Sequence, residues 1–102
     1  MKTILEELED KFHVTLSGDM DTAAAVEAEE ILKPLYTSKG KDVIIDCTRL
    51  DYIASSGLRI LIRILKSVKA GKSQVTLRNV NKDILNVLTL TGFLNLFILE
   101  QD

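Results

Sequence analysis

The 102-residue chain is poor in the residues that most often build cross-links and metal sites. It contains one cysteine, Cys47, and one histidine, His13, and it has no tryptophan. A single thiol cannot form a disulfide within the chain, and one cysteine with one histidine does not make the ligand set of a structural zinc site. We therefore expect no disulfide and no bound metal, and a reducing compartment.

Long apolar runs, clustered glycines and an excess of positive charge are also missing. The five glycines, at positions 18, 40, 57, 71 and 92, are too scattered for a dinucleotide fingerprint or a P-loop. No segment approaches the ~20 apolar residues of a membrane-spanning helix, and the N-terminus lacks the apolar core of a signal peptide. A net charge of −2 argues against general nucleic-acid binding. These absences predict a soluble cytoplasmic protein with no cofactor, no direct nucleic-acid binding and no membrane insertion.

What the chain does have is an apolar pattern whose period switches repeatedly. The pattern predicts strands over 3–8, 12–18, 42–48, 73–80 and 96–99, and helices over 21–32, 56–70 and 81–91. Strands that alternate with helices imply right-handed crossovers and a largely parallel sheet. We predict one α/β domain over residues 1–102, in which helices pack against a mixed, mostly parallel sheet of about five strands.

Some residues predict local features of these elements. The run Val43–Ile45 is apolar on both faces, which is typical of a central strand covered on two sides, and Cys47 just after it is expected in the core. Pro34 predicts a kink or a short final turn, with Ser38–Gly40 ending that element. Gly92 stands where a left-handed helix terminus favours glycine.

Charged side chains mark the outer faces of two predicted helices. The glutamates at 27, 29 and 30 are expected to face water on the helix over 21–32. Arg59, Arg63 and Lys66 recur at helical spacing in the next helix. They form either a basic patch for an acidic partner or a solvated helix face.

The sequence lacks a complete set of residues for hydrolytic catalysis. A serine hydrolase needs a nucleophile, a base and a strained turn, but the segment around Ser55 reads ASSGL and lacks the first glycine of G-x-S-x-G. The only histidine, His13, alternates with apolar residues in a strand and is expected to be exposed there. We therefore interpret the chain as a binding protein rather than an enzyme, with no catalytic residue.

The most unusual stretch is DYIASSGLRILIRIL, over residues 51–65, where Ser55, Ser56 and Gly57 lie directly before a helix. A serine at the N-cap satisfies a free amide and is worth ~1 kcal/mol over alanine, which explains one serine but not the second. Gly57 either lets another backbone approach closely or relieves crowding. Sites in such sheets usually form where strand ends meet helix starts, and the loop over 18–21 is another such junction.

Three stretches resemble the STAS domain family of bacterial anti-sigma factor antagonists. DCTRLDYIASSGLRIL, over 46–61, is similar to the family's strand and serine loop, with its strand-end aspartate at Asp46 and a small polar residue at Thr48. SGDMDTAAAVEAEEIL, over 17–32, is similar to the family's G-x-x-D and helix, and it places the aspartate at Asp21. NVNKDILNVLTLTGFLNLFIL, over 79–99, resembles the C-terminal helix and closing strand. The resemblance covers essentially the whole chain in order.

The resemblance implies a partner switch. Unmodified antagonists of this family bind an anti-sigma factor with serine kinase activity, which phosphorylates the first serine of the pair, and a metal-dependent serine phosphatase restores it. That serine is Ser55 here, and the ATP and the metal belong to the partners. The resemblance also implies support of the loop by Asp46 and Thr48 through side-chain hydrogen bonds. The partner-binding residues it implies are Asp21, Ser55, Ser56, Gly57, Leu58 and Arg59.

One residue departs from the family pattern. The position before the first serine is commonly aspartate, whereas this chain has Ala54. The change removes a negative charge and a hydrogen-bond acceptor beside the hydroxyl. STAS domains also serve as non-switching subunits of transport or other regulatory complexes, and Ala54 keeps that alternative open.

Overall fold

The computed structural model describes residues 1–37 and 40–102. Its three α-helices and first four strands lie where the apolar pattern predicts them, but the last strand covers 98–100 rather than 96–99, because Leu96 ends a short 3-10 helix. In chain order they are β1 (Lys2–Glu7), β2 (Lys11–Met20), α1 (Thr22–Leu32), the 3-10 helix η1 (Lys33–Thr37), β3 (Asp42–Ile53), α2 (Ser55–Ala70), β4 (Val75–Arg78), α3 (Lys82–Thr91), the 3-10 helix η2 (Leu94–Leu96) and β5 (Ile98–Glu100). The predicted α/β class is confirmed.

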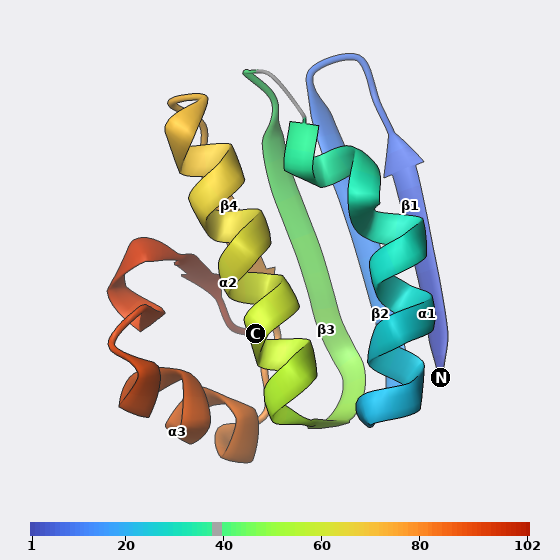
Figure 1. The fold of residues 1–102 in the computed structure, drawn as a ribbon. Coiled ribbons are helices and arrows are strands. Elements are labelled where there is room, and N and C mark those ends of the chain that lie inside the picture. Colours follow the sequence, from blue (N-terminus) through green and yellow to red (C-terminus); the bar gives the residue numbers. More distant parts are fainter. Residues whose placement is uncertain (38–39) are drawn as a thin grey trace.

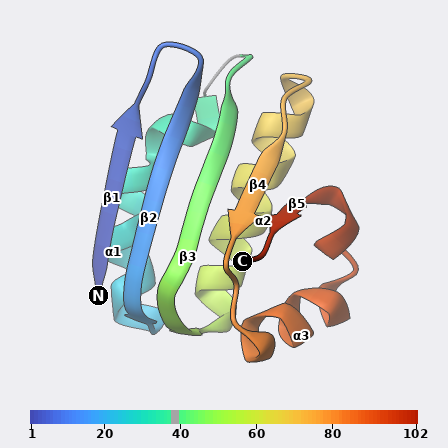
Figure 2. The same ribbon diagram turned by 180° about the vertical axis from the view of Figure 1, so that it is seen from behind.

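The strands form one sheet in the order β1-β2-β3-β4-β5. β1 runs antiparallel to β2, and each later strand runs parallel to its neighbour, so the predicted mixed, mostly parallel sheet is confirmed. α1 and α2 lie side by side across one face of this sheet (Figure 1). From behind, the opposite face of β1, β2 and β3 has no described helix in front of it (Figure 2). In both views α3 lies at the end of the molecule where α2 begins.

The hydrophobic core lies between the sheet and the layer formed by α1 and α2. Val43, Ile45 and Cys47 alternate into it from β3 and are each at most 1% exposed. Ile44 points the other way and is only half-buried. The prediction that Val43–Ile45 is covered on two sides is therefore wrong, because helices cover one face of the strand. Cys47 lies in the core as predicted, and burial raises the pKa of its thiol to about 12.

β2 and β3 continue beyond their predicted ends at Gly18 and Thr48. They stay paired as far as Met20 and Ile53, which are register partners, although the register shifts twice between Thr15 and Asp19. Such irregularities break the two-residue alternation by which a strand is recognised in a sequence, which explains the early predicted ends. Because the strands end side by side, the helices that follow them start at the same end of the molecule.

The helix ends agree with the predictions where the structure describes them. α1 stops at Leu32, and Pro34 lies in the η1 turn that follows, so the predicted short final turn is confirmed. Gly92 caps α3 with a left-handed φ of 78°, as predicted. Of the segment Ser38–Gly40 predicted to end the element, Ser38 and Lys39 lie outside the described residues.

Candidate functional site

Two strand-to-helix junctions meet at one end of the sheet. The backbone amide of Ala54 donates a hydrogen bond of 2.8 Å to the carbonyl oxygen of Met20. Asp21 follows Met20 directly and Ser55 follows Ala54, so α1 and α2 begin next to each other (Figure 1). The two junctions that the sequence singles out therefore form one surface.

Asp21 caps the first of these helices. Its Oδ1 accepts a hydrogen bond of 2.8 Å from the amide of Ala24, which satisfies one of the free amides of the first turn of α1. The side chain is exposed. Asp21 thus positions the start of α1 and still offers its carboxylate to solvent or to a partner.

The second helix begins without a side-chain cap. The N-cap of α2 is Ala54, whose φ of −78° and ψ of 166° are extended, and no side chain accepts a bond there. The interpretation of Ser55 or Ser56 as the N-cap is therefore wrong, because β3 continues to Ile53 and places Ala54 at that position. Ser55 is instead the first residue of α2, and it is exposed.

Ser56 and Gly57 lie closer to the protein interior. The Oγ of Ser56 is buried and has no hydrogen-bond partner. A Cβ atom at Gly57 would lie 2.5 Å from the Sδ of Met20 and 2.7 Å from the Cγ1 of Ile53, too close for either contact. Glycine at position 57 therefore allows the last residues of β2 and β3 to pack under the first turn of α2, which supports the interpretation that it relieves crowding.

Leu58 and Arg59 have opposite environments. Leu58 is buried, with 9% of its surface exposed, so it supports the first turn from the core and offers little area to a partner. This placement corrects the prediction that Leu58 is a contact residue. Arg59 is exposed and, within the described part of the chain, makes no hydrogen bond or ion pair.

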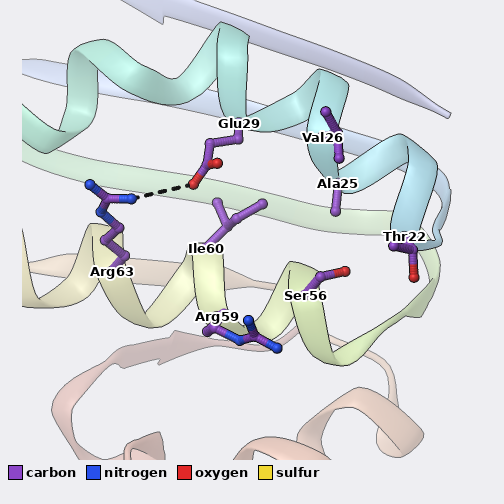
Figure 3. A pocket seen from close by; sticks show the side chains of 8 residues that line it. All are labelled: Thr22, Ala25, Val26, Glu29, Ser56, Arg59, Ile60 and Arg63. Atoms are coloured by element: carbon purple, nitrogen blue, oxygen red, sulfur yellow. Dashed lines mark ion pairs between the residues drawn. The ribbon is translucent and has the colours of Figure 1, made fainter.

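A groove between α1 and α2 adjoins this surface and was not foreseen from the sequence (Figure 3). Its volume is about 300 Å³, and Val26 stands on its rim with 65% of its surface exposed. The groove is lined by Thr22, Ala25, Val26, Glu29, Ser56, Arg59, Ile60 and Arg63. The sequence indicates which residues lie on each helix, but which faces turn toward one another depends on how both helices pack on the sheet.

Glu29 joins a polar cluster at the far end of the groove. The hydroxyl of Tyr36 donates a hydrogen bond of 2.7 Å to Glu29 Oε2, and Arg63 Nη1 lies 3.7 Å from the same oxygen. The Arg63 guanidinium also lies over the Tyr36 ring, 4.3 Å from its centroid. Burial and the neighbouring carboxylate hold the pKa of Tyr36 well above its ordinary range. Glu29 is half-buried, so the expectation that it faces water is wrong.

The arginines and lysine at helical spacing on α2 therefore do not form a uniform basic patch. Arg63 is held by Glu29, and the Nζ of Lys66 lies 5.2 Å from the centroid of the Phe93 ring. Only Arg59, of these three, has no described partner. It is the cation of α2 that remains available beside the serines.

Asp46 and Thr48 bond to each other and to the segment after β4. Asp46 Oδ1 accepts hydrogen bonds from the amide of Thr48 (3.0 Å) and from its hydroxyl (2.5 Å), and Thr48 Oγ1 accepts one of 3.0 Å from Asn79. Burial acts to raise the pKa of Asp46, but the bonds from Thr48 outweigh it and lower the pKa. Among the described residues these bonds reach Asn79 and not Ser55, so Asp46 and Thr48 join β3 to the segment after β4, and the predicted hydrogen bonds from them to the serine loop are not formed.

Asn81 links the last part of β3 to the start of α3. Its amide nitrogen donates to the carbonyl oxygens of Leu50 (3.1 Å) and Asp51 (3.2 Å), near the end of β3. Its Oδ1 accepts a bond of 2.9 Å from the amide of Ile84 and so caps α3. Asn81 therefore ties the strand that leads to Ser55 to α3. An asparagine that opens a helix signals the cap but not the contact with a distant strand.

His13 and Ser55 are not brought together. His13 is half-buried on β2, where exposure was expected, and its Nδ1 has no hydrogen-bond partner. It pairs with Ile44 in β3, nine residues before Ile53, which corresponds to about 30 Å of strand. In residues 1–37 and 40–102 there is no group of three metal-ligating side chains, and no helix has the length and apolarity needed to cross a membrane.

Comparison of the sequence with known proteins identifies the family to which the chain belongs. A model of the STAS domain matches residues 2–102. The Bordetella bronchiseptica protein BtrV, provisionally named an anti-sigma factor antagonist, is 27% identical over 97 residues, which cover 95% of this chain and 84% of BtrV. The anti-sigma-B factor antagonist of Staphylococcus aureus is 26% identical over 94 residues, which cover 91% of this chain and 87% of that protein.

Solved structures agree on the fold. The anti-sigma factor antagonist SpoIIAA in its unphosphorylated form matches with a TM-score of 0.81 at 17% identity, over 99% of this chain and 88% of SpoIIAA. The phosphorylated form of SpoIIAA, a Bacillus cell fate determinant, matches with a TM-score of 0.79 at 16% identity, over 99% of this chain and 91% of that one. The arrangement of sheet and helices is therefore that of SpoIIAA.

Proposed function

Because the chain belongs to the STAS domain family, we propose that it is an anti-sigma factor antagonist switched by reversible phosphorylation of Ser55. Its partner is an anti-sigma factor with serine kinase activity, and a metal-dependent serine phosphatase reverses the modification in the cytoplasm. ATP and the metal are bound by these partners. The observation that carries the proposal is the position of Ser55, which is exposed as the first residue of α2.

The contact surface contains Asp21, Ser55, Ser56 and Arg59, while Gly57 is buried and shapes this surface from beneath the first turn of α2. Two features support one continuous surface. The starts of α1 and α2 are joined by the bond between Ala54 and Met20. Asp21, which follows Met20, and Arg59, one turn further along α2, are both exposed. A partner that covers Ser55 therefore meets charges of both signs, which favours a specific orientation of the complex.

Electrostatics separates the effect of a phosphate on folding from its effect on binding. A phosphoserine adds about −1.5 to −2 charges at pH 7. At the start of a helix that charge is favourable by ~0.3–1 kcal/mol, and Ser55 is exposed, so the fold tolerates it. A partner that closes over the same dianion must desolvate it, which costs several kcal/mol unless the charge is paired. Phosphorylation thus weakens the complex more than it perturbs the domain.

The test is incubation with ATP and the anti-sigma kinase encoded in the same genome. Mass spectrometry should show one added phosphate on the wild-type chain and on Ser56→Ala, and none on Ser55→Ala. The unmodified chain should form a complex with the kinase that the phosphorylated chain does not form. Absence of both the modification and the complex with every such kinase of the organism would reject the proposal.

One observation favours a second function, that of a non-switching STAS subunit in a transport or other regulatory complex. Ala54 leaves the first serine without the neighbouring carboxylate common in the family, and no other side chain caps α2 in its place. In that case Ser55→Asp should leave partner binding intact. The switching function instead requires that Ser55→Asp weaken it.

A further inference from the structure

The cations of α2 differ in what holds them. Arg63 is paired with Glu29 and stacked on Tyr36, and Lys66 lies over the ring of Phe93. Arg59 is exposed and has no described hydrogen bond, ion pair or ring contact. A guanidinium group that nothing holds is available to an anion that appears nearby.

Helix geometry places Arg59 near Ser55. Residues at i and i+4 share a helix face, with Cβ atoms about 5–6 Å apart. The Arg59 side chain runs back along α2 toward the turn that contains Ser56, the direction in which helical side chains usually point (Figure 3). The first turn of α2 contains no acidic residue that competes for this guanidinium, and Ala54 offers no side-chain oxygen.

We propose that Arg59 is the cation that pairs with the phosphate on Ser55. This inference rests on the proposed function and deepens it. The planar guanidinium donates two parallel hydrogen bonds to phosphate oxygens, the geometry in which arginine binds phosphate best. In the unmodified chain Arg59 is free to contact an acidic group of the partner. In the phosphorylated chain it is engaged within its own helix, so phosphorylation both adds a dianion to the contact surface and removes a cation from it.

The experiment installs phosphoserine at position 55 during translation, so that no kinase is needed. Phosphorus NMR titration then gives the second pKa of the phosphate, ordinarily about 6, in wild type, Arg59→Gln, Arg59→Lys and Arg63→Gln. A nearby cation favours the dianion, so the pKa should be about 0.3 units lower in wild type than in Arg59→Gln. Arg59→Lys, a point charge without the planar fork, should fall between them.

Arg63→Gln is the matched control, because it removes the same charge one turn further along the helix. Its phosphate pKa should equal that of wild type. Equal pKa values in wild type and Arg59→Gln would overturn the proposal. So would an equal rise in both glutamine variants, since that would indicate the general field of α2 rather than a specific pair. Amide NMR spectra establish that each variant is folded.

This result is independent of the result of the kinase test. If no kinase modifies Ser55, the installed phosphoserine still reports whether Arg59 pairs with it. If a kinase modifies Ser55 but the pKa does not depend on Arg59, the switch stands and only the role of Arg59 is rejected.

Discussion

The amide nitrogen of Ala54 lies 2.8 Å from the carbonyl oxygen of Met20 and donates a hydrogen bond to it. This bond fastens the last residue of β2 to the residue that separates β3 from α2. It explains how Asp21 and Ser55, which are far apart in the sequence, begin adjacent helices. The surface proposed for partner binding is thus positioned by a bond between backbone atoms.

Gly57→Ala should destabilise the domain, because the added Cβ would lie 2.5 Å from Met20 Sδ and 2.7 Å from Ile53 Cγ1. Overpacking of this kind typically costs about 1–3 kcal/mol. Urea unfolding should show a lower midpoint with an unchanged slope. Ser55→Ala, at an exposed position, serves as the control and should change the free energy of unfolding by less than about 0.5 kcal/mol. A midpoint as high as that of wild type would contradict the tight packing beneath α2.

Ala54→Asp should stabilise the domain by about 1 kcal/mol, because Ala54 already has the extended conformation of an N-cap and lacks the oxygen that would accept a free amide. Thermal unfolding at neutral pH measures the effect. Ala54→Asn separates the contribution of the capping hydrogen bond from that of the charge, since asparagine supplies the oxygen without the negative charge that the helix dipole favours. If neither variant is more stable than wild type, Ala54 does not function as the N-cap.

The sequence predicts elements well where one local rule decides them. Asn81 opens a predicted helix and caps it, and Gly92 ends the same helix in the left-handed conformation. At α2 the local rule fails, because two serines suggest a cap while the pairing of β3 with β2 continues to Ile53 and assigns the cap to Ala54. The pairing of β3 with β2 therefore moves the start of α2 by one residue. The apolar pattern of the sequence contains no information on that pairing.

In the candidate site, too, local features could be predicted from the sequence and contacts between elements could not. The exposure of Ser55 and Asp21 follows from their places at helix starts, so the sequence can predict it. Glu29 was expected to face water together with Glu27 and Glu30, yet α2 places Arg63 opposite it and Tyr36 donates to it. Contacts between two helices depend on their relative rotation on the sheet, which helical spacing alone does not determine.

Asp46→Asn should lower stability at neutral pH by about 1 kcal/mol, because the bonds from Thr48 favour the ionised carboxylate. Burial acts to raise the pKa of Asp46, but those bonds hold it below the ordinary value of 3.8. The stabilisation is therefore full above the unfolded pKa and is lost as the pH falls through the folded pKa. Urea midpoints measured from neutral to acid pH should show the difference between wild type and Asp46→Asn shrinking as the pH falls through the lowered pKa of Asp46. A difference that grows in acid would contradict the lowered pKa, and Asp10→Asn, at an exposed bend, is the control.

Tyr36→Phe should lower the free energy of unfolding by about 1 kcal/mol, because it removes the bond of 2.7 Å to Glu29 and keeps the ring beneath Arg63. Tyr52→Phe is the matched control, since Tyr52 is 53% exposed, and it should change stability by less than about 0.5 kcal/mol. Burial and Glu29 raise the pKa of Tyr36 above its ordinary 10.0, so the contribution is full below about pH 10 and is lost as the pH rises through the folded pKa.

A double-mutant cycle with Glu29→Ala tests whether one bond accounts for this effect. If it does, Tyr36→Phe should cost little more once Glu29 is gone, with a coupling energy of about 0.5–1.5 kcal/mol. Fully additive losses, or equal losses in Tyr36→Phe and Tyr52→Phe, would show that the hydroxyl of Tyr36 contributes nothing through Glu29. The cycle also bears on the groove, because Glu29 pairs with Arg63 in its lining. Releasing Arg63 by Glu29→Ala should leave the phosphate pKa at position 55 unchanged if Arg59 is its partner.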